Sequence, residues 1–428
     1  MKTALVSCSK VEGAVEAPPS KSYTHRAFAI ATLTSEKTTI HNPLISRDTI
    51  ATITASQMLG ATIREKGGVY EVVGLRRFRT PDNVIDVMNS GTTLRLYTGL
   101  STLVEKGYTV LTGDESIRRR PMAALLQSLN EIGAECWSTK QNGAAPVVVK
   151  GGNRIGGATT IKGTESSQYV SSLLVTGLNA HDQITVHVKD ELVSKPYVEA
   201  TIQMVKLFGG QIDRKGFEIF RTWPQTLHGI DFTVPGDFSS AAFIAAAAHL
   251  TQGRVIVKNV SETLPQADSK IVEIVKRYGS DAYFTDDGLV IEGGRRHVDA
   301  DVVLTDSPDL LPVTAAIAAV NDGVTRIRGV AHARLKESDR ISTVASEIRK
   351  LNIEVEEHDD GLTIHGSSKT AGGVAVDTYG DHRLFMAFTV LGLALEKGLA
   401  VKGAESADVS YPGFLTDLKA LGAKITVI

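Results

Sequence analysis

The 428-residue chain has few cysteines, little net charge and no long apolar run. Its two cysteines, Cys8 and Cys136, are too few for a secreted disulfide framework and favour a reducing cytosol. The formal net charge is -2, so the chain as a whole has no cationic surplus to attract nucleic acid. The longest apolar stretches, 243–248, 310–320 and 384–395, are shorter than the ~18–20 residues of a membrane helix. We therefore expect a soluble cytoplasmic protein that binds neither nucleic acid nor membranes.

Six segments share one pattern, in which an apolar-spaced helix is followed by a small break residue, a short strand, a turn and another strand. The break residues are Gly60, Gly133, Gly209, Gly279, Asn352 and Gly422. Gly and Asn accept the left-handed conformation that ends a helix. Turn signals such as Gly67-Gly68 then predict a hairpin. A period of about 70 residues is too long for a solenoid and predicts six α/β units, three in each of two domains.

The domain boundary is expected where proline and glycine gather near the middle of the chain. Trp223-Pro224 and Pro235-Gly236 mark this region. We place one domain at 15–230, and the other combines 1–14 with 231–428.

Two segments predict helix starts that suit anions. In PPSKSYTHRA, the residues after Pro18-Pro19 suit a helix N-terminus, which places Lys21, Ser22 and Arg26 in the first turns. Exposed N–H groups and the positive end of the helix favour anions there. In MNSGTTLRL, small residues including Asn89, Gly91 and Thr92 precede an apolar helix and can wrap backbone N–H groups around an anion. An ordinary capped helix is the plainer interpretation of the first segment and explains the second equally well.

Three further segments carry polar groups near expected helix starts. In SIRRRPM, Pro121 is expected to open a helix and to aim Arg120 at whatever that helix end faces, although arginine runs are usually solvated surface. GTESSQYVSSLL places Ser166, Ser167 and Gln168 before an amphipathic helix. LVSKPYVEAT contributes Ser194 and Tyr197 around a proline suited to a first helical turn.

The last two segments combine acids and cations. In RLKESDR, Lys336 and Arg340 would share a face if the segment is helical, and Glu337 beside two cations could move a proton. A solvated charged helix is the plainer interpretation. In YGDHRLFMAF, His382 and Arg383 directly precede an apolar helix, a costly place for charges unless something binds there.

Most of these segments begin helices in different repeats. If the repeats pack in parallel, the helix starts converge on one region between the domains, which would suit a small substrate with several phosphates and carboxylates. The histidines and cysteines show no metal-binding spacing, so we expect no metal ion.

Together the motifs resemble a known family. SKSYTHR, NSGTTLR, RRRP, SSQ, SKPY, Pro308-Asp309, KESDR and DHR occur in the order seen in 5-enolpyruvylshikimate-3-phosphate synthases, along the whole chain. The resemblance implies an α/β enolpyruvyl transferase fold with two domains, six βαβαββ repeats and an inter-domain cleft that closes on substrate. It also implies transfer of the enolpyruvyl group of phosphoenolpyruvate to the 5-hydroxyl of 3-phosphoshikimate, with release of phosphate, in the shikimate pathway to chorismate and the aromatic amino acids. We expect a monomer that needs no cofactor.

The resemblance also implies roles for residues at the matching positions. Asp309 would take the proton of the 5-hydroxyl, Glu337 would protonate the methylene carbon of phosphoenolpyruvate, and Lys21 would also act in catalysis. The residues expected to bind 3-phosphoshikimate are Lys21, Ser22, Arg26, Ser166, Ser167, Gln168, Ser194, Tyr197, Asp309 and Lys336. Those expected to bind phosphoenolpyruvate are Lys21, Asn89, Gly91, Thr92, Arg120, Gln168, Arg340, His382 and Arg383.

The chain departs from the family pattern at three positions. Pro19 stands where many members have Gly, and His332 where many have Asn beside the shikimate ring. Val409 stands where members often have a phosphate-binding Lys, and Lys402 is the nearest lysine in sequence.

Two alternative functions share the fold. One is the sister enzyme that transfers enolpyruvyl to UDP-N-acetylglucosamine and typically has a Cys in the loop before its Arg-Pro. Here that loop reads Glu115-Ser116-Ile117-Arg118, without a Cys. The other is a non-catalytic anion-binding relative, for which Val409 would be the sign.

Overall fold

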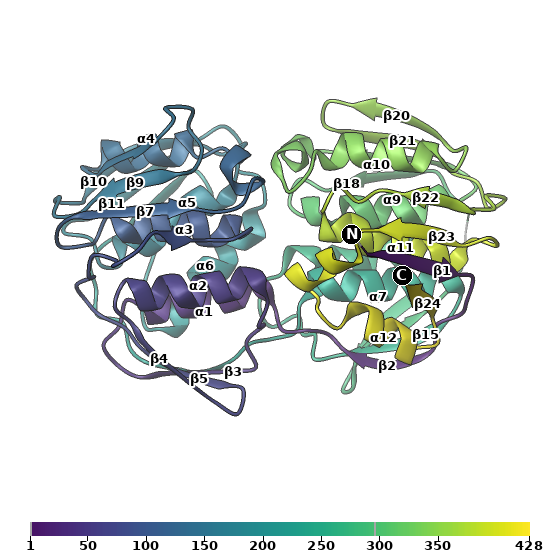
Figure 1. Ribbon diagram of the computed structural model, residues 1–428, viewed down its shortest axis with the longest axis horizontal. Coiled ribbons are helices and arrows are strands. Elements are labelled where there is room, and N and C mark those ends of the chain that lie inside the picture. The colour runs from purple at the N-terminus through teal and green to yellow at the C-terminus, as the bar shows by residue number, and fades with distance from the viewer. Residues whose placement is uncertain (1, 295–296) are drawn as a thin grey trace. The chain divides into compact units, whose positions relative to one another are not determined.

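The computed structural model describes residues 2–294 and 297–428, which fold into two compact units (Figure 1). The N-terminal unit is Pro19–Pro235, and the C-terminal unit joins Met1–Pro18 to Gly236–Ile428. The boundaries expected from the sequence, 14/15 and 230/231, lie a few residues before these positions. The sequence expectation of six βαβαββ repeats, three in each unit, is confirmed by six separate four-stranded sheets.

Each sheet has the same internal order. The first and second strands of a repeat run parallel, and the fourth strand lies antiparallel between the second and the third. Where the strands of a repeat follow one another in the chain, the first helix supplies the long crossover that the parallel pair needs, and a tight hairpin joins the third and fourth strands.

The N-terminal unit contains three repeats. The first consists of α1 (Lys21–Ala31), β3 (Thr38–His41), α2 (Arg47–Met58), β4 (Thr62–Lys66) and β5 (Val69–Val73), with β14 (Asp231–Thr233) as its first strand. The second consists of β6 (Ile85–Asp86), α3 (Gly91–Ser101), β7 (Tyr108–Thr112), α4 (Ala123–Glu131), β8 (Glu135–Ser138) and β9 (Val147–Lys150). The third consists of β10 (Gly157–Lys162), α5 (Ser167–Gly177), β11 (Ile184–Lys189), α6 (Lys195–Leu207), β12 (Asp213–Lys215) and β13 (Ile219–Thr222).

The C-terminal unit repeats the plan. Its first repeat consists of β2 (Gly13–Glu16), α7 (Phe238–Thr251), β15 (Arg254–Lys258), α8 (Ile271–Arg277), β16 (Asp281–Thr285) and β17 (Gly288–Glu292). The second consists of β18 (Ala300–Val303), α9 (Leu311–Ala319), β19 (Val324–Arg328), α10 (Arg340–Arg349), β20 (Glu354–His358) and β21 (Gly361–His365). The third consists of β22 (Val374–Val376), α11 (His382–Ala394), β23 (Leu399–Lys402), α12 (Phe414–Ala420) and β24 (Lys424–Val427), closed by β1 (Thr3–Ser7).

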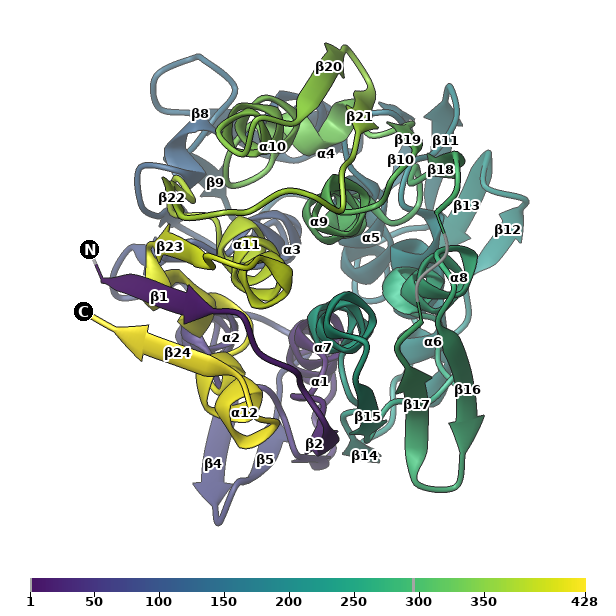
Figure 2. The ribbon, with the colours of Figure 1, turned by 90° about the vertical axis from the view of Figure 1, so that its right-hand side faces the viewer.

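The first helix of each repeat is buried. In the C-terminal unit α7, α9 and α11 pack against one another inside the ring of sheets (Figure 2). Their sequences are apolar on all sides, which is typical of a helix without a solvent face. The three longest apolar stretches of the chain are therefore core helices. Within the described part of the chain, no helix combines the length and the apolar character needed to span a membrane.

The six break residues all adopt positive φ, from 59° at Asn352 to 111° at Gly60. Each lies two or three residues after the last residue of the second helix of its repeat, so the expected helix ends are confirmed. The hairpin predicted at Gly67-Gly68 is also confirmed, because these residues join β4 to β5.

Candidate functional site

The start of α1 is held by a carboxylate from α2. Nζ of Lys21 lies 3.1 Å from Oδ2 of Asp48, and the Asp48 side chain is only 6% exposed. The other oxygen of Asp48 is buried and makes no hydrogen bond with any described residue. The backbone carbonyl of Asp48 also accepts a bond from the Thr93 hydroxyl at 3.4 Å, which ties this corner to α3. Sequence reasoning missed Asp48, because nothing in the sequence near it indicates that it meets Lys21.

Arg26 is bound within the protein itself. Its Nε donates to the Thr201 hydroxyl at 2.9 Å, and its two Nη atoms donate to the carbonyls of Ser22 and Tyr197. Burial is the main cause that lowers the pKa of Arg26, to about 10, and the nearby tyrosines oppose it. This arginine therefore ties α1 to the start of α6, where Ser194 is the buried N-cap residue.

The start of α3 brings three expected residues together. Nη2 of Arg120 donates to Oδ1 of Asn89 at 3.1 Å. A Cβ on Gly91 would lie 2.7 Å from Nη1 of Arg120. Any residue other than glycine would therefore displace the guanidinium group of Arg120. Ser90 caps the helix by accepting from the Thr93 N–H.

The expectation that Pro121 opens a helix is wrong. Residues Ile117–Arg119 form a short 3-10 helix, and α4 begins only at Ala123. The backbone of Arg120 is extended, and the main chain of Met122 bonds instead to the carbonyl of Gly143. Arg120 is thus placed by the loop and by Asn89, and not by a helix end.

The starts of α3 and α5 are joined by Gln168. Its amide nitrogen donates to the Thr92 hydroxyl at 3.1 Å, and its carbonyl accepts from Nη1 of Arg95 at 2.7 Å. Ser166 caps α5 by accepting from the backbone N–H of Gln168, and Ser167 is the first residue of the helix. Arg95 belongs to the same group, although the sequence analysis read it only as part of an apolar helix.

In the C-terminal unit, acids and cations gather around one buried arginine. We call this group the Arg340 cluster; it consists of Asp309, Lys336, Glu337, Arg340, Asp381 and Arg383. Arg340 Nη1 lies 2.6 Å from Asp309, its Nη2 lies 2.7 Å from Glu337, and its Nε lies 2.7 Å from Asp381. Asp309 also meets Arg383 at 2.9 Å and Lys336 at 3.6 Å. The five acids and cations expected here, Asp309, Lys336, Glu337, Arg340 and Arg383, thus lie in one cluster, in which Lys336 and Arg383 contact Asp309 and Asp309 and Glu337 contact Arg340.

The helical interpretation of RLKESDR is wrong for its first residues. Residues Ala331–Leu335 form a 3-10 turn, Lys336 is extended, and α10 begins at Arg340 with Asp339 as its N-cap. Lys336 and Arg340 therefore share no helix face, and they meet through Asp309 instead. The break leaves Glu337 off the helix, where it can reach Arg340.

The charged side chains of the Arg340 cluster shift one another's pKa values. Burial by itself raises the pKa of Asp309, but Arg383, Lys336 and Arg340 outweigh it and hold that pKa well below its usual range. Burial lowers the pKa of Arg340, and the three carboxylates around it raise the pKa above its ordinary value. The cluster pairs three basic side chains, Lys336, Arg340 and Arg383, with three acidic ones, Asp309, Glu337 and Asp381.

Two histidines border this cluster. His382 is the first residue of α11 and is buried, next to the N-cap Asp381. His332 is 6% exposed, and burial, together with the positive charge of Lys336, lowers its pKa to about 4. The imidazole of His332 is therefore neutral near pH 7.

The segment around Val409 contributes no cation. Val409 ends a 3-10 helix, Ala404–Val409, and its side chain is buried. Lys402 lies exposed at the end of β23, paired with Thr3 of β1. The structure thus places a buried apolar side chain at the position where family members often have lysine.

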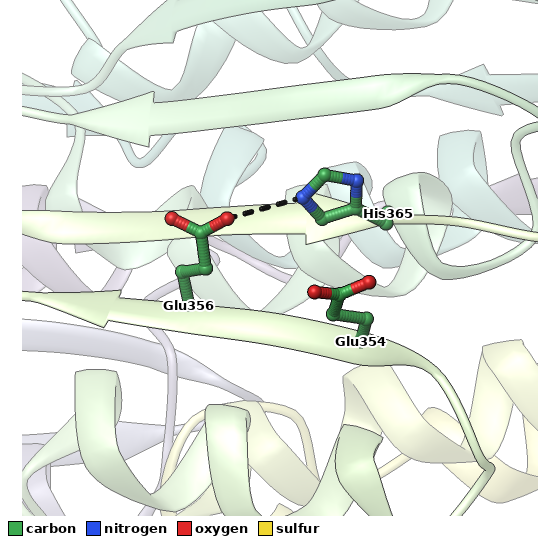
Figure 3. Close-up of side chains that lie close together, drawn as sticks. All are labelled: Glu354, Glu356 and His365. Carbon is green, nitrogen blue, oxygen red and sulfur yellow. Dashed lines mark hydrogen bonds and ion pairs between the residues drawn. The ribbon is translucent and has the colours of Figure 1, made fainter.

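One group of described side chains has a spacing that could hold a metal ion. Glu354 and Glu356 on β20 and His365 on β21 offer ligand atoms that all lie within 4.8 Å of one another (Figure 3). His365 Nε2 and Glu356 Oε1 are 3.3 Å apart, and both glutamates are exposed. The group lies on a surface hairpin, and none of its members belongs to the Arg340 cluster.

Nearly the whole chain matches a known family. The model of EPSP synthase (3-phosphoshikimate 1-carboxyvinyltransferase) matches residues 6–418. A protein of Methanocella arvoryzae named 3-phosphoshikimate 1-carboxyvinyltransferase is 43% identical over 99% of this chain and 100% of its own length. One of the same name from Methanocaldococcus jannaschii is 39% identical over 98% and 97%.

A solved structure agrees. An EPSP synthase from Acinetobacter baumannii is 26% identical, with a TM-score of 0.83 over 100% of this chain and 99% of that one. Since the sequence match spans nearly the full chain and the fold match spans all of it, the chain belongs to the EPSP synthase (3-phosphoshikimate 1-carboxyvinyltransferase) family.

Proposed function

We propose that this protein transfers the enolpyruvyl group of phosphoenolpyruvate to the 5-hydroxyl of 3-phosphoshikimate and releases phosphate, as a cytoplasmic enzyme of the shikimate pathway. The observation that carries the proposal is that Asp309 and Glu337 are both bound to Arg340, at 2.6 and 2.7 Å. The reaction needs a base, an acid and cations for two anionic partners, and the Arg340 cluster holds all three kinds of group.

The proposed chemistry proceeds by addition and elimination. The 5-hydroxyl oxygen attacks C2 of phosphoenolpyruvate while Asp309 takes its proton and Glu337 gives a proton to C3. The resulting tetrahedral adduct loses a proton from its new methyl group and expels phosphate, which restores the double bond. Guanidinium groups suit the carboxylate and the phosphate because their forked donors match both.

The resting charges fit this role. Asp309 is held as a weak base by Arg383, Lys336 and Arg340. A substrate carboxylate bound to Arg383 and Arg340 would draw both guanidinium groups away from Asp309. Its pKa would then rise, and it would become a better proton acceptor when substrate is present.

The N-terminal unit supplies the proposed binding residues for the rest of both substrates. Lys21, Ser22, Arg26, Ser166, Ser167, Gln168, Ser194 and Tyr197 are proposed for 3-phosphoshikimate, with Asp309 and Lys336 from the C-terminal unit. Lys21, Asn89, Gly91, Thr92, Arg120 and Gln168 are proposed for phosphoenolpyruvate, with Arg340, His382 and Arg383. The hydrogen bonds of Gln168 to Thr92 and of Arg120 to Asn89 support this grouping.

The sister reaction on UDP-N-acetylglucosamine is less well supported. The loop before Arg120 contains no cysteine. Cys136 is buried in β8, and Cys8 follows β1, so neither belongs to that loop.

A phosphate-release assay tests the proposal. The purified protein is mixed with phosphoenolpyruvate and either 3-phosphoshikimate or UDP-N-acetylglucosamine. Release with the first acceptor only supports the proposed reaction. Release with the second only would identify the sister reaction, and release with neither would indicate a binding protein.

A further inference from the structure

A buried carboxyl beside the Arg340 cluster takes no part in the proposed reaction. Asp268 lies in the short 3-10 helix Ala267–Lys270, and its side chain is almost completely buried, with the residue 1% exposed. Its Oδ2 accepts a hydrogen bond from the Ser239 hydroxyl on α7. Its Oδ1 is buried and makes no hydrogen bond to any residue in 2–294 or 297–428.

The position of Asp268 is built into the core. Gln266 bonds with its side-chain oxygen to the N–H of Phe238 and with its amide to the carbonyl of Gly236, which fixes the segment against the start of α7. The Ser307 hydroxyl donates to the carbonyl of Ala267 at 2.7 Å. Since Ser307 is two residues before Asp309, the segment that holds Asp268 is tied directly to the segment that holds the proposed base.

The surroundings of Asp268 favour its neutral form. Burial is the main cause that raises its pKa, to about 7, and the negative charge of Asp309 adds to it. Asp237, the N-cap of α7, raises the pKa further, whereas Arg383 on α11 and the hydroxyl of Ser239 lower it. These are the charged and polar groups that act on Asp268 from the elements around it. Burial and the charge of Asp309 thus favour the protonated form of Asp268, whereas the cations around Asp309 favour its ionised form.

Whether Asp268 carries a proton should affect the binding of an anionic substrate to the Arg340 cluster. Three cations and three carboxylates of the Arg340 cluster already cancel. Loss of the proton would add a negative charge in a buried segment that the Ser307 hydroxyl ties to the segment of Asp309, and Asp309 itself lies 2.9 Å from Arg383. That charge would attract Arg383 and repel an incoming carboxylate.

We propose that Asp268 is a positioning residue for phosphoenolpyruvate: it carries a proton when substrate binds, and once ionised it competes with the substrate for Arg383. The inference rests on the proposed function, because Arg383 is the proposed ligand of the substrate. The reaction scheme above includes neither Asp268 nor a dependence of phosphoenolpyruvate binding on its protonation.

The test compares the pH dependence of the KM for phosphoenolpyruvate in wild type and in Asp268→Asn. Asparagine has the shape of the protonated acid and stays neutral at every pH. In wild type the KM is expected to rise on the order of tenfold between pH 6 and 8.5, the size expected for one charge acting at intermediate dielectric. The substrate phosphate titrates in the same range, at about pH 6, so the difference between the two proteins is the quantity that counts.

In Asp268→Asn, the KM for phosphoenolpyruvate is expected to change with pH only as far as titration of the substrate phosphate requires. The kcat of this variant at pH 6 is expected to stay near the wild-type value. A wild-type rise that persists in the variant overturns the inference. Glu347→Gln is the matched control, because Glu347 is a fully buried carboxylate of the same unit that bonds to Lys350 and Tyr379. This variant is expected to lose stability and to keep the wild-type pH dependence of KM.

Ser239→Ala provides a second variant if Asp268→Asn does not fold. Removal of the hydroxyl that bonds to Asp268 takes away a donor that favours ionisation, so the inflection in KM should move to higher pH. An inflection that stays in place would contradict the role of Asp268.

Protein stability, measured without substrate, tests this inference separately from the proposed function. The folded-state pKa of Asp268 lies above the ordinary value, so its contribution to stability is complete below about pH 4 and is lost as pH rises through about 7. The unfolding midpoint of Asp268→Asn minus that of wild type should therefore increase from pH 5 to 8. If the difference in unfolding midpoint does not change with pH, Asp268 does not titrate as proposed, even if the enzyme is active. If the difference increases but the protein releases no phosphate, Asp268 titrates as proposed and the proposed function is wrong.

Discussion

Arg340 and Asp381 form an ion pair in which neither side chain is more than 1% exposed, with Nε 2.7 Å from Oδ2. A second contact, from Nη2 to Oδ1 at 3.3 Å, makes the pair two-pronged. Asp381 also caps α11 by accepting from the Arg383 N–H. One carboxylate thus orients the guanidinium that binds Asp309 and Glu337 and fixes the helix that carries Arg383.

Removal of Asp381 should therefore be costly. Asp381→Ala is expected to lower the free energy of unfolding by about 3–5 kcal/mol, because it leaves a buried guanidinium without its main partner. Urea unfolding measures this loss. Asp301→Ala is the control, since its two-pronged pair with Arg328 is about half exposed and should cost less than about 1 kcal/mol. Equal losses of unfolding free energy in the two variants would show that the buried pair of Arg340 and Asp381 stabilises the protein no more than an exposed pair does.

Removal of the proposed acid or base should reduce turnover. Glu337→Gln and Asp309→Ala are each expected to lower kcat by at least ~10²-fold, as for other positioned acids and bases. Phosphate release under saturating substrates measures the effect. Glu356→Gln, an exposed glutamate outside the cluster, should turn over normally. Near-normal turnover in both cluster variants would remove their assigned roles.

Gly91→Ala should act through Arg120. The added Cβ would lie 2.7 Å from Nη1 of Arg120, the far end of a flexible side chain, so the guanidinium should move while the fold stays intact. We expect the KM for phosphoenolpyruvate to rise several-fold, which corresponds to a loss of about 1 kcal/mol of binding free energy, with little change in the unfolding midpoint. In an Arg120→Ala background, Gly91→Ala should add nothing. A further rise in that background would mean that the methyl group acts on another group.

His332 should make the protein sensitive to acid. Its pKa of about 4 lies below the ordinary value of 6.5, so the stability that it contributes is present above pH 6.5 and is lost as pH falls towards 4. His332→Asn should therefore gain stability over wild type on acidification, by up to about 3 kcal/mol at pH 4. Thermal unfolding of both proteins from pH 7.5 to 4 measures the difference. A difference that does not change with pH would show that His332 titrates normally in the folded protein.

Chelation should leave the reaction unchanged. The Glu354, Glu356 and His365 group lies on the β20–β21 hairpin and has no member in the Arg340 cluster. Turnover after treatment with EDTA is expected to equal that of the untreated enzyme, and the triple variant with alanine at these positions should behave likewise. Loss of activity that zinc restores in wild type but not in the triple variant would assign a metal to the hairpin.

Local interactions made the repeat architecture predictable. Apolar periodicity, the left-handed break at residues such as Gly60 and Asn352, and the turns between β4 and β5 act over a few residues, so they can be read without tertiary structure. The starts of α1, α3 and α5 followed from capping patterns of the same range. The errors, at Pro121 and at Lys336, lie in segments where long-range contacts rather than helix propensity decide the backbone.

The sequence by itself therefore determined the six repeats, the helix ends at their break residues, and the residue types available for binding anions. Only the tertiary structure decided which charges meet. Asp48 reaches Lys21 from 27 residues away, and Asp381 reaches Arg340 from 41 residues away. The proton on Asp268 depends on burial under α7 and on the charge of Asp309, which come from separate segments. The physical reason is that secondary structure follows from neighbours along the chain, whereas a protonation state follows from desolvation and charges that folding brings together from distant positions.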